Sequence, residues 1–302
     1  MRLRTLIALL LAVCLAAPAA ALADGYTDAS PPGANDFSCK PSAAHPNPVV
    51  LVHGLGASME ANWYWMSPRI QAQGYCVFAL TYGLTANNPP PFNDMGGTVP
   101  MEQSSHELAA FVDRVLTATG AAKVDIVGHS EGSLMPDYYL KFLPDSHYTD
   151  GPLAGQPKVD RYIGMTPLWQ GTNLAEAGTL SQSDPTGIGN AIEQGMSNYG
   201  CGSCTEFIQG SDFIKGMNAD GGPKVPGVTY TMLMTTHDEL VQPYTSGNMP
   251  GATNIVMQDQ CAADPSEHLA MAANPNALLD VLNALDPAHT RPVDCTTLAN
   301  FS

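Results

Sequence analysis

The chain contains the segment Gly128-His129-Ser130-Glu131-Gly132 between an apolar run at 124–127 and a helix-like segment at 133–140. In this context, G-x-S-x-G is typical of a nucleophile elbow, a tight strand-to-helix turn that exposes the serine hydroxyl. The alternative is a solvent-exposed serine on a glycine-rich turn, and the strand-turn-helix context favours the elbow. The sequence therefore predicts that Ser130 attacks a carbonyl carbon.

Short apolar runs alternate with helix-like segments along the chain. The runs predict buried strands at 48–52, 76–80, 124–127, 162–165, 228–234 and 254–257. Helices are expected at 61–72, 102–119 and 133–140. Because strands and helices alternate, we predict an α/β fold with a mostly parallel central sheet and helices on both faces.

The first residues have the features of an export signal. Arg2 and Arg4 precede an apolar stretch at 6–15 that is too short to span a membrane. Ala21-Leu22-Ala23 then provides a cleavage site with small residues. We therefore expect a signal peptide over 1–23, cleavage after about Ala23 and secretion to the extracellular space.

The remaining residues, 24–302, are expected to form a single domain. Cleavage removes two arginines and no acid, so the formal net charge changes from −16 to −18. Such a surface disfavours nucleic acid and anionic membranes as partners, but it permits transient contact with a neutral lipid interface. No stable membrane anchor is expected, because Val13 before Cys14 matches a lipoprotein cleavage site poorly and no later apolar run is long enough.

An even number of cysteines, six, follows the signal peptide, which indicates disulfides in a secreted chain. Fifteen connectivities are open. The expected pairs are Cys39–Cys76, Cys201–Cys204 and Cys261–Cys295. The spacing of Cys201 and Cys204 also fits a redox motif, but no thioredoxin-like strand precedes it, so a structural bridge is favoured. No metal site is expected, because neither a second such pair nor spaced histidines accompany it.

A serine nucleophile needs a base to accept its proton and an acid to orient that base. In a sheet of this kind the chain order is serine, then aspartate or glutamate, then histidine. Asp238 follows the run at 228–234, and His268 follows the last expected strand. Both would lie at the carboxyl ends of strands, near the elbow. The sequence therefore predicts Ser130, Asp238 and His268 as a catalytic triad.

Other acids and histidines fit these roles less well. Glu239 is adjacent to Asp238, and we expect its side chain to point elsewhere. His237 is too close in sequence to Asp238 to be its partner. The remaining candidates are interpreted as turn or surface residues: Asp212, Asp220, His45, His106, His147 and His289.

An oxyanion intermediate needs hydrogen-bond donors. We expect the backbone N–H of Glu131, the residue after the nucleophile, and that of Leu55 in the loop after the first strand. His53 and His129 are interpreted as packed structural residues. The sequence assigns no role to the Glu131 side chain.

About sixty residues separate two of the expected strands, which is too long for a structureless loop. We interpret 166–227 as a candidate cap or acyl-pocket insertion, with short helices at 188–196 and 207–217. The apolar residues expected to line an acyl site are Trp169, Leu174, Ile188, Ile192, Met196, Phe207 and Phe213. An ordinary local core explains these residues equally well.

Several segments along most of the mature chain match one family pattern. They are Val50-Leu51-Val52-His53-Gly54, Asn62-Trp63, Gly74-Tyr75-Cys76-Val77-Phe78-Ala79-Leu80, the elbow, Asp238-Glu239-Leu240-Val241-Gln242-Pro243 and Glu267-His268-Leu269. Together they resemble the secreted actinobacterial triacylglycerol lipases of the α/β-hydrolase superfamily. The resemblance implies an α/β-hydrolase fold, the same triad and the same three disulfides. Gln170 is a departure, since such lipases often carry histidine before the Gly-Thr pair, and it weakens any inference about the acyl pocket.

These observations favour a secreted serine hydrolase of carboxylic esters, with lipid esters as substrates and no cofactor. Two enzyme alternatives use the same triad: a short-chain carboxylesterase and an acyltransferase. A secreted binding protein on a hydrolase scaffold is the alternative outside catalysis. Loss of a triad member would be its mark, and the sequence retains all three residues.

Overall fold

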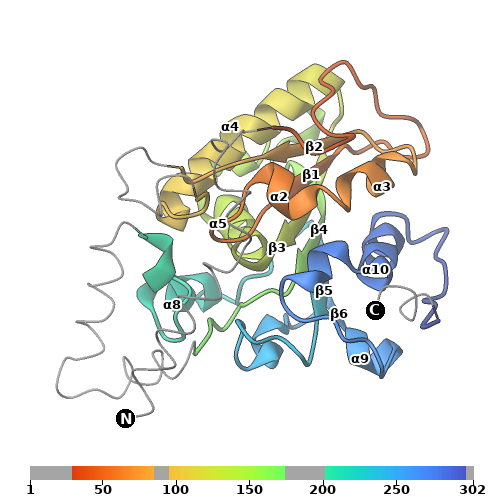
Figure 1. Cartoon of the computed structure of the whole chain (residues 1–302). Helices are drawn as coiled ribbons and strands as arrows, with labels where there is room; N and C mark the ends of the chain where they lie inside the picture. The colour runs from red at the N-terminus through yellow and green to blue at the C-terminus, as the bar shows by residue number, and fades with distance from the viewer. Residues whose placement is uncertain (1–28, 85–94, 174–200, 297–302) are drawn as a thin grey trace, which may run out of the picture.

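The computed structural model describes residues 29–84, 95–173 and 201–296 (Figure 1). Within these ranges six parallel strands form one sheet in the order β2-β1-β3-β4-β5-β6. The strands are β1 (Val49–Val52), β2 (Val77–Leu80), β3 (Val124–His129), β4 (Val159–Met165), β5 (Thr229–Met234) and β6 (Thr253–Val256). The predicted α/β class and parallel sheet are confirmed.

Helices cover both faces of the sheet (Figure 1). The α-helices are α2 (Met59–Trp63), α3 (Ser67–Gln71), α4 (Met101–Thr119), α5 (Met135–Phe142), α8 (Asp212–Asn218), α9 (Met257–Gln260) and α10 (Pro275–Leu285). Apolar residues of α4, α5 and α8 pack on one face, and those of α2, α3 and α10 pack on the other. Both faces of the central strands are thus buried, which explains their continuous apolar sequence.

Short 3₁₀ helices make several of the connections. They are η2 (Ser130–Ser133), η3 (Pro144–Ser146), η4 (Gly151–Leu153), η6 (Ser203–Thr205), η7 (Tyr244–Gly247) and η8 (Ala270–Ala273). The first of them, η2, begins at the predicted nucleophile.

The register of the sheet brings the ends of its central strands together. Val52 at the end of β1 pairs with Gly128 of β3, and Gly128 pairs with Gly164 of β4. Because the strands are parallel, the loops that follow them emerge at one edge. That edge holds the elbow and the loops that carry the other predicted site residues, as expected for ligand sites in such sheets.

Two of the expected helices differ from those observed. A single helix over 61–72 is wrong, because α2 ends at Trp63 and α3 begins at Ser67. Pro68 occupies the first turn of α3, where its missing N–H is tolerated, but it would break the interior of one long helix. The expected helix over 207–217 is also displaced, since α8 spans Asp212–Asn218. The expected helix over 102–119 corresponds to α4, which Gly120 ends in a left-handed conformation.

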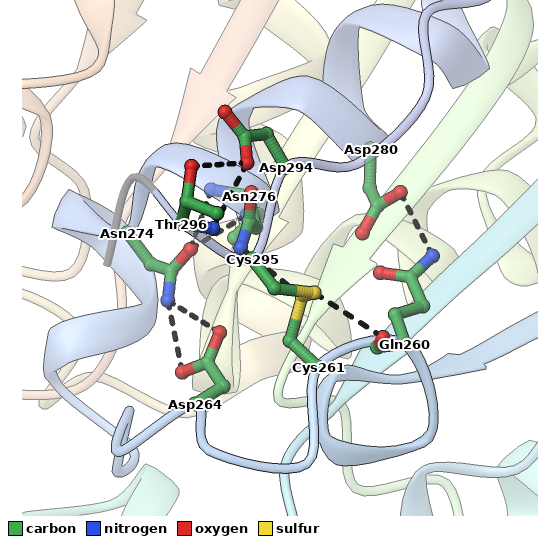
Figure 2. Close-up of a disulfide and its surroundings, with 10 residues drawn as sticks. Gln260, Cys261, Asp264, Asn274, Asn276, Asp280, Asp294, Cys295 and Thr296 are labelled. Carbon is green, nitrogen blue, oxygen red and sulfur yellow. Dashed lines mark hydrogen bonds between the residues drawn. A yellow bond between two sulfur atoms is a disulfide. The ribbon is translucent and has the colours of Figure 1, made fainter. Parts of the chain in front are cut away.

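Three disulfides join the six described cysteines as expected: Cys39–Cys76, Cys201–Cys204 and Cys261–Cys295. Figure 2 shows the last of them, which ties the C-terminal segment to the chain just after α9. The expected signal peptide and the expected helix over 188–196 lie outside the described residues. None of the helices in the described ranges has the length and apolarity that a membrane crossing requires.

Candidate active site

The elbow holds Ser130 between β3 and η2. The φ of Ser130 is 56°, in the left-handed region that residues other than glycine seldom adopt. A Cβ on Gly128 would lie 1.9 Å from the carbonyl oxygen of Gly132, and one on Gly132 would lie 2.3 Å from that of Val52. Strand and helix therefore approach too closely for side chains at these two glycines, and Ser130 is left partly exposed at the turn.

Asp238 and His268 are in direct contact. His268 Nδ1 lies 2.9 Å from both Asp238 Oδ1 and Oδ2, and both residues are buried. The backbone N–H groups of Leu240 and Val241 donate to Asp238 Oδ1, at 3.0 and 2.7 Å. These donors stabilise the carboxylate anion, which accepts the Nδ1 proton and leaves the lone pair on Nε2 of the neutral imidazole. A histidine in this state can accept a proton from a serine.

His129 connects the elbow to the histidine loop, a role that the sequence did not reveal. Its Nε2 lies 3.0 Å from the carbonyl oxygen of His268, and its Nδ1 lies 3.0 Å from Asn62 Oδ1. The same Asn62 oxygen accepts from the backbone N–H of Gly54 at 3.2 Å. Burial lowers the pKa of His129 to about 3, so its ring is neutral at physiological pH and its single N–H can serve one of these two oxygens. Asn62 and His129 thus connect the segment after β1, the end of β3 and the loop after β6.

The predicted oxyanion donors lie beside the nucleophile. A Cβ built on Gly54 would lie 3.0 Å from Ser130 Cβ and 3.5 Å from Ser130 Oγ, so the backbone of this loop passes next to the serine. Leu55 N–H makes no hydrogen bond within the described ranges. Glu131 lies in the first turn of η2, where helix amides lack an intrahelical acceptor. Both amides are therefore available to an oxyanion.

The structure does not join Ser130 and His268 directly. In the part of the chain that is described, Ser130 Oγ forms no hydrogen bond, and the two residues are connected through His129. Catalytic hydrogen bonds are often loose without substrate and tighten in the reacting complex.

The Glu131 side chain is buried behind the elbow, with 1% of its surface exposed. The Tyr82 hydroxyl lies 3.0 Å from Glu131 Oε1 and 2.9 Å from the carbonyl oxygen of His53. Burial raises the pKa of Glu131 to about 8, although the nearby hydroxyls of Ser203 and Tyr82 act in the opposite direction. Sequence reasoning missed the role of this carboxyl, and its only signal is an acidic residue directly after the nucleophile.

The other candidates lie apart from this arrangement. Glu239 accepts from the backbone N–H of His268 at 3.2 Å and does not contact its ring. Several candidates are exposed: Asp212, Asp220, His106, His237 and His289. His45 stacks on Tyr75, and His147 contacts Ser146. No cluster of three or more potential metal ligands occurs among the described residues.

The described apolar residues of the insertion belong to the core. Trp169 is fully buried and its Nε1–H donates to Met232 Sδ at 3.2 Å. Phe213 stacks on Tyr138 of α5, with ring centroids 5.4 Å apart, and Phe207 is buried in the same cluster. The remaining residues proposed for an acyl pocket, Leu174, Ile188, Ile192 and Met196, lie outside the described ranges. The described part of the insertion therefore supports the ordinary-core interpretation.

Comparison with known families gives a match over most of the chain. Residues 46–279 match the family model described as Lipase (class 2). A curated triacylglycerol lipase of Burkholderia plantarii is 35% identical over 128 residues, which are 40% of this chain and 32% of that protein. One of Pseudarthrobacter phenanthrenivorans is 36% identical over 108 residues, 34% of this chain and 30% of that protein. The chain thus spans about a third of the length of the curated relatives that it matches.

Solved structures show the same fold. Lipase B of Aspergillus fumigatus superposes with a TM-score of 0.60 at 19% identity, covering 89% of this chain and 58% of that one. The mature lipase BlEst2 of Bacillus licheniformis gives a TM-score of 0.55 at 18% identity, covering 81% of this chain and 94% of that one. At this identity the likeness concerns the fold alone.

Proposed function

This chain belongs to the class 2 lipase family, and from that premise we propose that it is a secreted ester hydrolase that cleaves acylglycerols or related lipid esters. Its nucleophile is Ser130. The observation that carries the proposal is the contact between His268 and the buried Asp238 at the edge of the sheet where the elbow emerges. We propose further that the chain is a secreted actinobacterial member of the family, on the resemblance of its 74–80 block and of Glu131 after the serine.

The reaction begins when Ser130 Oγ attacks the ester carbonyl and His268 Nε2 accepts the serine proton. Asp238 holds the ring in the required tautomer and stabilises the imidazolium that forms. The N–H groups of Leu55 and Glu131 bind the oxyanion of the tetrahedral intermediate.

Collapse of this intermediate breaks the ester C–O bond, and the leaving alcohol takes its proton from His268. Water, deprotonated by His268, then attacks the acyl-enzyme, and a second tetrahedral intermediate releases the carboxylic acid and restores Ser130. No cofactor takes part in these steps.

The domain organisation completes the proposal. A signal peptide over 1–23 precedes a single hydrolase domain over 24–302, with a cap or acyl-pocket insertion at 166–227. Three disulfides support an oxidising extracellular location. The acidic surface suits transient docking on a neutral lipid interface rather than on an anionic membrane.

Labelling with a fluorophosphonate probe tests the nucleophile. We expect one probe per wild-type chain, located on the peptide 124–141, and no labelling of Ser130→Ala. That peptide also contains Ser133, whose hydroxyl donates to the carbonyl oxygen of Ser130 at 2.6 Å, so Ser133→Ala is the matched control and should still be labelled. An unlabelled wild-type protein, or label retained by Ser130→Ala, would overturn the proposal. Hydrolysis of emulsified triacylglycerol compared with a soluble short-chain ester then separates a lipase from a carboxylesterase.

A further inference from the structure

The proposed mechanism uses the backbone of Glu131 and leaves its carboxyl without a role. This carboxyl is buried directly behind the nucleophile, and Oε2 has no hydrogen-bond partner within the described residues. Oε1 lies 3.0 Å from the Tyr82 hydroxyl. A buried ionised carboxylate with so few donors is costly, so the position calls for an explanation.

Counting protons identifies the state of this carboxyl. The Tyr82 hydroxyl has one proton and lies within hydrogen-bond distance of two oxygens, Glu131 Oε1 and the carbonyl oxygen of His53. The carbonyl can only accept. If Tyr82 donated to Glu131, the Tyr82 hydroxyl oxygen and the His53 carbonyl oxygen would face each other at 2.9 Å with no proton between them. Both contacts become hydrogen bonds when Tyr82 donates to His53 and a protonated Glu131 donates to Tyr82.

We propose that Glu131 is a positioning residue that acts as a neutral carboxylic acid, donating to Tyr82 and thereby fixing the two segments that carry the oxyanion donors. One segment is the elbow, with the Glu131 amide. The other is the loop after β1, where His53 precedes Gly54 and Leu55. This inference rests on the proposed function.

Packing around the carboxyl supports this role. Gly97 donates its N–H to the carbonyl oxygen of Tyr82 at 2.8 Å, and Gly56 donates to that of Gly96 at the same distance. A Cβ on Gly97 would lie 2.9 Å from Glu131 Oε1 and 3.2 Å from Leu55 Cα. The backbone of Gly97 therefore packs against the Glu131 carboxyl and also against the backbone of Leu55. Through this packing the position of the carboxyl influences the position of Leu55.

The surrounding charges also favour the neutral acid. The acidic neighbours are Glu107 of α4, which raises the pKa of Tyr82, and Glu206 beyond η6, whose own pKa is raised in part by Glu131. His53 is stacked on Tyr82, and burial lowers its pKa to about 4, so it supplies no positive charge at neutral pH. Burial keeps the pKa of Tyr82 well above its usual value, so the phenol remains protonated. None of the described groups that shift the pKa of Glu131 is a cation.

The sign of the pH effect follows from the direction of the shift. Burial raises the pKa of Glu131 to about 8, so the folded protein holds the acid neutral below that pH and loses its hydrogen bond above it. In the wild type we expect kcat to fall above the midpoint to a plateau about tenfold lower, while KM changes little.

Glu131→Gln provides the test, because its amide N–H can donate to Tyr82 and does not titrate. The measurement is the pH profile of kcat on a soluble ester, each profile normalised to its own maximum. We expect the alkaline decline near pH 8 in the wild type and its absence in Glu131→Gln. The same decline in both proteins would overturn the proposal.

Two further variants separate hydrogen bonding from general packing. Glu131→Ala lacks the donor, and we expect its kcat to be about tenfold below that of Glu131→Gln at neutral pH. Equal values would contradict the hydrogen-bond role. Tyr82→Phe removes the shared hydroxyl, and we expect a similar loss in kcat at unchanged KM; an unchanged kcat would count against the proposal. Thermal unfolding of each variant excludes loss of the fold, and fluorophosphonate labelling of the wild type shows whether the hydrolase proposal stands even if this one fails.

Discussion

Two buried carboxyls flank the elbow, and their surroundings differ in one respect. Asp238 is 3% exposed and Glu131 is 1% exposed, so depth does not distinguish them. Asp238 accepts hydrogen bonds from two backbone amides and from the His268 ring. Glu131 is surrounded by hydroxyls instead, and burial raises its pKa to about 8. The number of N–H donors, rather than burial alone, decides which carboxyl carries a charge.

The groups that hold the chain around the two carboxyls also differ. On the histidine side, buried side chains form a network. Asn274 donates to both oxygens of Asp264 at 3.1 and 3.0 Å (Figure 2). Asp264 also accepts the backbone N–H of Ser266, two residues before His268. On the oxyanion side, backbone contacts dominate: Ser203 Oγ donates to the carbonyl oxygen of Gly97, which closes over Glu131. The histidine side is thus held by contacts between polar side chains, and the oxyanion side by hydroxyl groups together with close backbone packing.

The largest effect is expected from Asp238→Asn. The amide cannot match two backbone donors and the His268 Nδ1 proton as the carboxylate does, so the imidazole tautomer becomes wrong for catalysis. We expect kcat to fall by about ten-thousandfold, measured on a soluble ester at neutral pH.

Glu239→Gln is the matched control for this substitution. Its carboxylate accepts the backbone N–H of His268 and makes no contact with the imidazole ring among the described residues, so we expect a loss of no more than about tenfold. If Asp238→Asn lost no more activity than this control, Asp238 would not be the acid that orients His268. The two buried carboxyls would then not have the different roles assigned to them here.

A smaller effect, on stability, should follow from removing one disulfide in each region. Cys261 and Cys295 are 34 residues apart and close a long loop that contains His268, so we expect their replacement by serine to lower the free energy of unfolding by about 3–4 kcal/mol. Cys201 and Cys204 are 3 residues apart, and we expect a smaller loss from the same change.

Chemical denaturation with and without reductant measures both losses. A larger loss from the short-range pair would contradict the loop-closure argument. It would indicate that the oxyanion side depends on the Cys201–Cys204 loop, through Gly202 and Ser203, more than the backbone contacts suggest.

The sequence contained enough to predict the elbow, the strands and the cysteine pairs, because each depends on local pattern or chain order. The break between α2 and α3 was not predicted, although Pro68 in the first turn of α3 is a local signal for it. The environment of Glu131 was not predictable, because Tyr82 and Gly97 meet the carboxyl only through the folded sheet. His129 was expected to pack beside the elbow, but its contact with the carbonyl of His268 spans 139 residues and leaves no sequence pattern.

The protonation states themselves can be read by carbon-13 NMR of the carboxyl groups during a pH titration. The two resonances are assigned by their loss in Glu131→Gln and Asp238→Asn. We predict that the Glu131 resonance is that of a neutral acid at neutral pH and shifts with a midpoint near pH 8, while the Asp238 resonance provides the reference for a carboxyl that accepts two backbone N–H groups. A Glu131 resonance that is already a carboxylate at neutral pH would contradict the account.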